Sequence, residues 1–175
     1  CRQKCYTLKK GVSRVSKVFL SIGLTGYTQS IDTMTWYNSY TGFPYKHLGN
    51  DTETGIDCFN LCALVFKKEL GIDIPYTTAD FCNIVDEDWY TKTHERWMDR
   101  AASEEHGWIK VKEPKLYDVI LMSLGSTHVT NHCALYVDKN RILQTMINHK
   151  SWVAPYGKYY KQYTTGIFRW KDLMN

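Results

Sequence analysis

The spacing of the apolar residues changes once along this 175-residue chain, and that change limits the folds open to it. In several stretches before residue 108, apolar residues recur every three or four positions, as on one face of a helix. After residue 108 they fall in short runs rich in β-branched and aromatic residues, separated by Gly, Asn, Asp and Pro. Helices followed by strands predict an α+β fold whose strands pair antiparallel.

The segment 57–71 carries the clearest helix signals. Asp57 is a good N-cap residue, and Gly71 suits the left-handed position that follows a helix. The residues between them are apolar on nearly every side, which predicts a central, buried helix. The stretch 72–107 is polar and is also expected to be mostly helical, whereas 31–57 is rich in turn residues and predicts loops.

Composition excludes several classes of protein. With 43% hydrophobic and 23% charged residues, the chain is neither disordered nor a coiled-coil rod. No stretch approaches ~18 consecutive apolar residues, so we expect no membrane-spanning helix. The runs that predict strands are 108–111, 117–123, 132–137, 141–146 and 165–170.

Residues 1–30 are expected to form a basic extension that precedes a domain over residues 31–175. The first 31 positions hold six Lys and Arg and no Asp or Glu, while the remainder is close to neutral. Apolar residues at helical spacing between Gly11 and Gly23 predict a short amphipathic helix. The extension either docks on a partner or packs on the flank of its own domain. It lacks an aromatic or Gly-rich recognition motif, so we expect no nucleic-acid partner.

One of the six cysteines differs from the others in its position. Cys58 directly follows the predicted N-cap, where the positive end of the helix lowers the pKa of a thiol and favours the nucleophilic thiolate. Cys62, Cys82 and Cys133 are expected to be buried, inert thiols. The sequence has no complete metal-ligand motif and no Gly-rich phosphate loop, so we expect no metal and no other cofactor.

A thiol nucleophile needs a base, and His132 opens the predicted strand 132–137. The chain then turns and returns as 141–146. A three-residue loop over 138–140 places Gln144 across from Ala134, on the same face as His132, whose ring Gln144 can then hydrogen-bond. A bulge between the two strands would have the same effect, whereas a regular two-residue turn would turn Gln144 to the opposite face. His128 and His149, both in predicted loops, are the competing bases.

The sequence around Cys58 resembles that of the NlpC-type cell-wall peptidases, which are papain-like cysteine enzymes of bacteria and phages. Pro44-Tyr45 is similar to the family's Pro-Tyr loop, and 57–61 to its Asp-Cys-x-Gly-Leu motif at the start of the central helix. The segments 70–75 and 166–169 resemble phage tail members. The resemblance covers roughly residues 34–170.

This resemblance implies a papain-like domain in which a central helix bearing the nucleophile packs on an antiparallel sheet. Position by position, it implies that Cys58 is the nucleophile, His132 the base and Gln144 the third polar residue. Tyr45 matches a loop tyrosine whose hydroxyl points toward the site. With the backbone N–H of Cys58, Tyr45 is therefore the candidate for stabilising the oxyanion.

The implied activity is hydrolysis of a peptide bond in the stem peptide of bacterial peptidoglycan, next to a D-configured acidic residue. The protein is then expected in the virion, as part of a phage tail, or at the bacterial cell envelope, with residues 1–30 attached to another tail protein.

Two alternatives stay open. One is a structural tail component, or a tail-assembly factor, with weak or absent activity. It is favoured by Asn60, which replaces the family's usual Gly and is expected to narrow the approach to Cys58. The other is a Cys/His amidase or acyltransferase acting on another substrate. Tyr117 also stands where the family usually has Gly, and we expect it to affect a turn.

Overall fold

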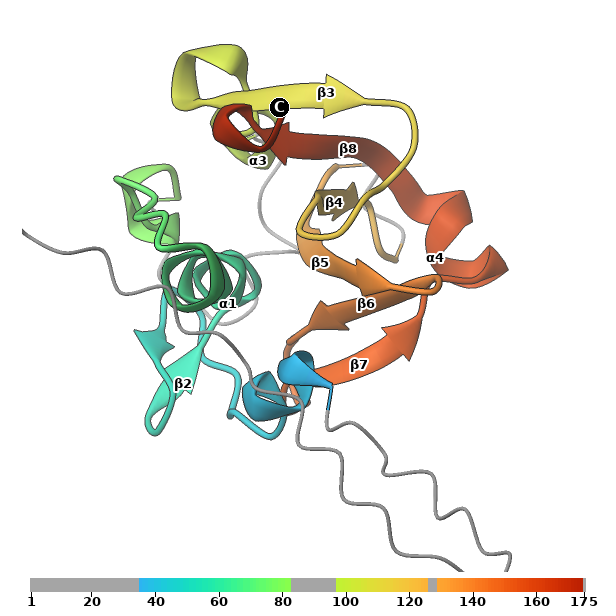
Figure 1. Cartoon of the computed structure of the whole chain (residues 1–175). Coiled ribbons are helices and arrows are strands. Elements are labelled where there is room, and N and C mark those ends of the chain that lie inside the picture. The colour runs from blue at the N-terminus through green and yellow to red at the C-terminus, as the bar shows by residue number, and fades with distance from the viewer. Residues whose placement is uncertain (1–34, 83–96, 126–128, 175) are drawn as a thin grey trace, which may run out of the picture. The chain divides into compact units, whose positions relative to one another are not determined.

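The computed structural model describes residues 35–82, 97–125 and 129–174, and these form an α+β domain in which helices pack on one antiparallel sheet (Figure 1). The strand order is β3-β8-β4-β5-β6-β7, and a separate two-stranded ladder joins β1 to β2. The strands are β1 (Asn50–Asp51), β2 (Gly55–Ile56), β3 (Trp108–Val111), β4 (Val119–Met122), β5 (His132–Asp138), β6 (Arg141–Gln144), β7 (Trp152–Pro155) and β8 (Thr164–Trp170). The helices are α1 (Cys58–Val65), α3 (Trp97–Ala101) and α4 (Lys158–Tyr163), with short 3-10 turns at Trp36–Tyr40, Thr78–Asp80, Glu104–His106 and Lys171–Leu173.

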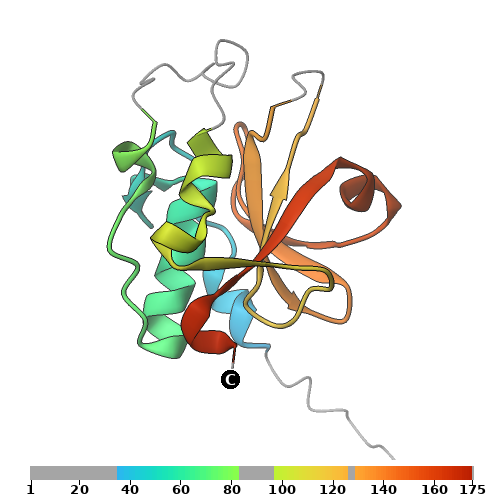
Figure 2. The ribbon, with the colours of Figure 1, turned by 90° about the horizontal axis from the view of Figure 1, so that it is seen from above.

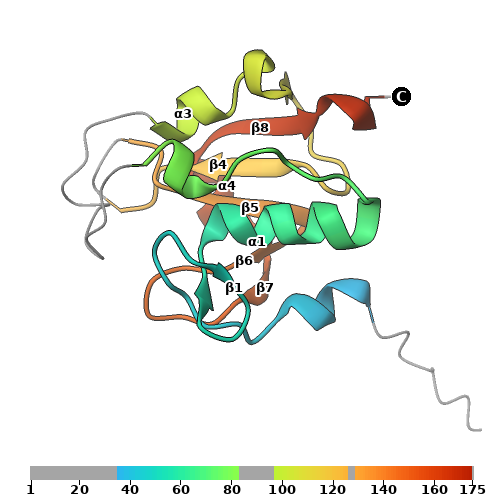
Figure 3. The same cartoon turned by 90° about the vertical axis from the view of Figure 1, so that its left-hand side faces the viewer.

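The central helix predicted from the sequence is present. Helix α1 continues through a π-helical turn at Phe66–Leu70 and ends at Gly71, whose φ of 68° is the left-handed conformation expected there. Asp57 caps its N-terminus by accepting a hydrogen bond from the backbone N–H of Asn60 at 2.8 Å. The helix lies across one face of the sheet (Figures 2 and 3). Leu61, Val65 and Phe66 are fully buried in that contact.

Alternation along the strands divides the core into two clusters. Side chains on one face of β4 and β5 pack with α1, and those on the opposite face pack with β6, β7 and the region of α4. On β5, Cys133 and Leu135 belong to the helix-facing cluster and Ala134 belongs to the other. A strand of this sheet therefore presents neighbouring residues to two different environments.

The described part of the stretch 72–107 is less helical than predicted, and residues 83–96 lie outside the described residues. In the described part of it, residues 72–77 are irregular, and helix is limited to Thr78–Asp80, α3 and Glu104–His106. Tyr76 shows why, since its ring stacks on Phe59 of α1 and its hydroxyl donates a hydrogen bond to the carbonyl of His106 at 2.9 Å. Contacts with distant residues thus hold this segment over the helix layer, and they outweigh the local preference for helix.

The closing strand β8 is tied to the start of β4 by a buried ion pair. Arg169 donates two hydrogen bonds to Asp118, from Nε at 2.8 Å and from a terminal nitrogen at 2.7 Å. Asp118 is fully buried and its side chain also accepts the backbone N–H of Lys115. The preceding Tyr117, at the position where a Gly was expected, adopts a φ of 71°, so this residue does shape a turn.

The basic extension over residues 1–30, with its predicted amphipathic helix, lies outside the described residues. Among the residues that are described, no helix combines the length and apolar character needed to cross a membrane.

Candidate active site

Cys58 is the first residue of α1, directly after the N-cap, as its sequence position predicts. Its side chain is 6% exposed. The pKa of its thiol is held well below the ordinary value by a hydrogen bond from the side chain of Cys133 and by the hydrogen bond and positive charge of His132, against the opposing effect of burial. The thiolate, which is the nucleophilic form, is therefore populated at lower pH than in an ordinary cysteine.

His132 and Gln144 come together across the β5–β6 hairpin. His132 Nε2 lies 2.8 Å from Gln144 Oε1, and the two side chains are 4% and 0% exposed. This bond occupies one ring nitrogen, which leaves Nδ1 for the thiol of Cys58. The thiol, the imidazole and the amide thus form one connected group contributed by α1, β5 and β6.

The hairpin achieves this arrangement differently from the predicted three-residue loop. The inner register pairs Leu135 with Leu143 and Tyr136 with Ile142, which is the register required for Gln144 to share a face with His132. The chain turns, however, through only two residues, Lys139 and Asn140, which have φ of 38° and 58°. A bulge between Tyr136 and Asp138 supplies the extra residue. The three-residue loop is therefore wrong, and the bulge, which was the other way to satisfy the parity, is present.

Cys133 contacts the site from a direction that strand alternation alone did not predict. Alternation along β5 places Cys133, which packs in the cluster with α1, and His132 on opposite faces of the strand, yet both side chains interact with Cys58. They converge because the N-terminus of α1 lies over the start of β5. Hydrogen bonds to Cys58 and Cys62, together with burial, raise the pKa of the Cys133 thiol, which therefore stays protonated and donates to the Cys58 sulfur.

A cleft of about 200 Å³ opens beside Cys58 and His132. Tyr45, half-buried on the loop before β1, lines the same cleft, and its backbone bridges to Ile56 just before the nucleophile helix. The cleft wall is largely apolar, and the other described residues that form it are Leu124, Gly125, Asn131, Met146 and Ile147. The arrangement suits a peptide-sized substrate whose carbonyl lies against the thiol.

Asn60 does not line this cleft. Its side-chain amide donates hydrogen bonds to the carbonyl of Gly49 at 2.8 Å and to Asp57 Oδ2 at 3.1 Å. The residue is 5% exposed and connects the loop that carries Tyr45 to the cap of α1. The expectation that Asn60 narrows the approach to Cys58 is therefore wrong, because buried carbonyl and carboxylate acceptors hold its side chain away from the cleft.

Asp57 is an unusual capping residue because its carboxyl group is almost wholly enclosed. Burial, and then the charge of the neighbouring Cys58, raise the pKa of Asp57 to about 8, although backbone N–H donors act in the opposite direction. A negative charge on the Asp57 carboxyl group and a negative charge on the Cys58 thiolate thus repel each other, so each disfavours ionisation of the other.

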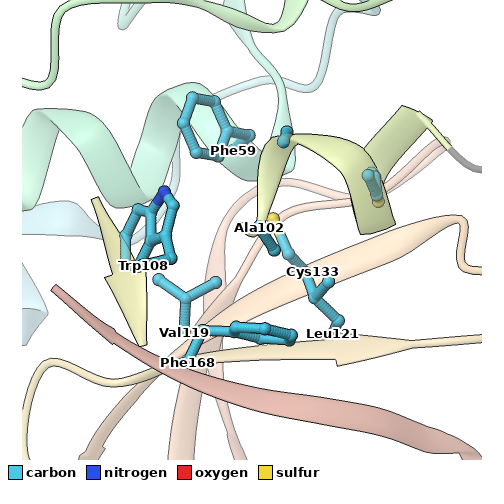
Figure 4. Close-up of a pocket in the computed structure, with 9 residues that line it drawn as sticks. Phe59, Ala102, Trp108, Val119, Leu121, Cys133 and Phe168 are labelled. Carbon is cyan, nitrogen blue, oxygen red and sulfur yellow. The ribbon is translucent and has the colours of Figure 1, made fainter. Parts of the chain in front are cut away.

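A second hollow, of about 20 Å³, lies between α1, the region of α3 and the sheet (Figure 4). Its walls are apolar apart from one thiol, that of Cys133, and include Phe59, Trp108 and Phe168. An apolar space of this size resembles a packing gap and has no polar group to orient a ligand. In the described part of the chain, no group of three or more His, Cys, Asp or Glu is arranged to hold a metal ion.

A helix that presents a thiol to an imidazole on an antiparallel sheet defines the class of papain-like α+β domains. Within that class the sequence model of the NlpC/P60 family matches residues 42–169. The chain therefore belongs to the NlpC/P60 family, which consists of cysteine peptidases and other hydrolases of peptidoglycan.

Individual relatives are distant. The tail tip assembly protein K of Escherichia phage N15 is 25% identical over 123 residues, a match that covers 67% of this chain but only 46% of that protein. An NlpC/P60 family protein from Bacillus cereus has a similar fold, with a TM-score of 0.50 and 17% identity over 74% of this chain and 36% of its own. The NlpC/P60 domain of the peptidoglycan hydrolase SagA aligns with a TM-score of 0.47 and 19% identity over 75% of this chain and 91% of its own.

Proposed function

We propose that the chain is a cysteine peptidase that cleaves a peptide bond in the stem peptide of peptidoglycan. The observation that supports this most directly is the 2.8 Å contact between His132 Nε2 and Gln144 Oε1 beside a thiol whose pKa is lowered. A thiolate, a base and a residue that orients the base are the minimum for acyl transfer to a cysteine. Membership of the NlpC/P60 family supports the choice of substrate.

In the proposed reaction the Cys58 thiolate attacks the scissile carbonyl carbon. The oxyanion that forms is stabilised by the backbone N–H of Cys58 and by Tyr45, which lines the same cleft. His132 gives a proton to the leaving amine as the acyl–enzyme forms, and then activates the water that releases the acid. Gln144 Oε1 accepts a hydrogen bond from Nε2 of the His132 ring. This bond keeps the other ring nitrogen, Nδ1, directed to the sulfur of Cys58.

We further propose that the protein acts in a phage tail, where residues 1–30 attach it to another tail protein. Similarity to a tail tip assembly protein supports this setting, and the virion or the bacterial envelope is then its location. The same similarity also favours the second candidate function, a tail-assembly component with little or no hydrolytic activity. An amidase or acyltransferase acting on another substrate is a third.

Digestion of purified cell walls separates these candidates. The parent protein should reduce wall turbidity and release peptides whose masses identify the cleaved bond. Cys58→Ser should keep the fold but lose activity by a factor of about 10³ or more, as is typical when the nucleophile is removed. Cys82→Ala, which alters another buried thiol, is the control and should remain active. Equal digestion by Cys58→Ser would reject the peptidase proposal, and an inactive parent would favour the assembly role.

A further inference from the structure

Behind the Cys58–His132–Gln144 group lies a fourth polar side chain that the sequence did not single out. Tyr160, on α4, receives a hydrogen bond from Gln144 Nε2 to its hydroxyl at 2.8 Å. The amide of Gln144 is therefore bonded at both ends, with its oxygen to His132 and its nitrogen to Tyr160. Gln144 itself is fully buried, so no bulk water is available to replace either partner.

The direction of this amide determines what the imidazole can do. With Oε1 toward His132, Gln144 accepts the Nε2–H of the ring and stabilises the doubly protonated ring that pairs with a thiolate. With the amide reversed, an N–H of Gln144 would face the Nε2–H of the charged ring, and two donors would oppose each other. The Tyr160 hydroxyl can donate as well as accept, so it is the charged ring that selects the direction of the amide. In that direction the hydroxyl supplies the acceptor without which the buried amide N–H would be unpaired, at a cost in free energy.

The position of Tyr160 is itself fixed by the fold. Its ring packs against the core cluster on the sheet face away from α1, and its backbone carbonyl accepts the hydroxyl of Thr164 at 3.0 Å. Thr164 in turn pairs with the hydroxyl of Tyr156 at 2.9 Å. These contacts connect α4 to the start of β8. The position of the Tyr160 hydroxyl next to Gln144 is therefore fixed by the packing of α4.

We propose that Tyr160 is a positioning residue, which anchors the Gln144 amide against the ring of His132 and so keeps His132 as the hydrogen-bonding partner and proton donor of Cys58. This inference rests on the proposed function, because it assigns Tyr160 a part in the same reaction. Among the described residues, Cys58 from α1 and Gln144 from β6 interact with the His132 side chain. Cys133 and Asp57 are the titratable groups that also interact with Cys58, and Tyr160 acts only through Gln144.

Tyr160→Phe tests this role, because it removes the hydroxyl and keeps the ring. Two measurements need no substrate: the nitrogen NMR shifts of the His132 ring, and the rate at which iodoacetamide alkylates Cys58 as a function of pH. In Tyr160→Phe the midpoint of the alkylation profile should move upward by about one pH unit, corresponding to roughly a tenfold smaller thiolate fraction on its lower limb. The ring shifts should show a weaker Nε2–H hydrogen bond.

Tyr159→Phe is the matched control, since Tyr159 lies on the same helix and is 57% exposed. It should leave both measurements unchanged. If the parent digests cell walls, Tyr160→Phe should also lower kcat by about tenfold with little change in KM, because the loss concerns the reacting groups. If the parent does not digest cell walls, the proposed function is rejected. The ring shifts and the alkylation profile still test whether Tyr160 positions Gln144, because neither measurement needs a substrate. Unchanged ring shifts and an unchanged alkylation profile in a folded Tyr160→Phe protein would overturn the proposal, even if activity fell.

Discussion

Asn60 illustrates how a single residue can depart from a family pattern without entering the site. Its amide joins Gly49 on the loop that carries Tyr45 to Asp57 at the cap of α1. A Gly at this position would leave the buried carbonyl of Gly49 without this donor. Asn60 therefore adds a side-chain hydrogen bond, which a Gly cannot make, and this bond fixes the loop to the helix.

We expect Asn60→Gly to lower the free energy of unfolding by about 2 kcal/mol, from the lost amide and the weak helix propensity of Gly. Urea unfolding measures this loss. Asn60→Ala is the matched control and should be less destabilising by about 1 kcal/mol, because only the amide is lost. Wall digestion by both variants should stay close to that of the parent. A more active Asn60→Gly protein of unchanged stability would show that Asn60 obstructs the cleft after all.

Asp57 predicts a pH dependence of stability. Its pKa is about 8 in the folded protein and near 3.8 when exposed, so the folded state retains a proton that the unfolded state has lost. The protonated Asp57 carboxyl group therefore contributes to the free energy of unfolding. This contribution is fully present below pH ~4 and is lost as pH rises through about 8. Between pH 5 and 7, the unfolding free energy of the parent should fall relative to that of Asp57→Asn by up to about 1.4 kcal/mol per pH unit. Urea unfolding of both proteins at pH 5, 6 and 7 measures this, and a difference independent of pH would contradict the assignment.

At the scale of elements, the β5–β6 hairpin decides whether the base and its partner meet. The bulge between Tyr136 and Asp138 offsets the two strands by one residue, and without that offset Gln144 would face away from His132. The turn and the bulge have separate roles, since the turn reverses the chain and the bulge sets the register.

This separation predicts that the turn can be improved without affecting the site. Lys139 and Asn140 both have positive φ, a conformation that Asn-Gly adopts more readily. The double variant Lys139→Asn/Asn140→Gly should therefore raise the free energy of unfolding by about 1 kcal/mol. Its wall digestion and Cys58 alkylation should match those of the parent. A stabilised protein with lost alkylation at neutral pH would mean that the turn, and not the bulge, sets the register.

At the scale of the whole molecule, the family match begins after the basic extension, at residue 42. We expect deletion of residues 1–30 to leave wall digestion by the remaining domain largely intact, because the described site is formed by residues from 45 onward. Binding to a tail partner, measured by co-sedimentation with tail structures, should be lost. A truncated domain that is folded yet inactive would show that the extension contributes to the site.

The sequence alone determined the features that follow local rules. The N-cap before Cys58, the left-handed Gly71 and the strand period after residue 108 are each set by a few neighbouring residues. The period of a strand, which backbone geometry fixes, also restricted the hairpin to two outcomes for Gln144, but the bulge that selected the outcome was visible only in the structure. The α+β order follows from these elements.

Only the tertiary structure decided the contacts between residues far apart in the chain. Cys133 meets Cys58 because α1 begins over the start of β5, and Tyr160 meets Gln144 because α4 carries it to the far face of the sheet. The irregular course of residues 72–77 and the inward-facing amide of Asn60 likewise depend on partners at a distance. Such contacts are invisible in a sequence, because burial and hydrogen-bond partners are properties of the packed chain and outweigh local propensity by kilocalories.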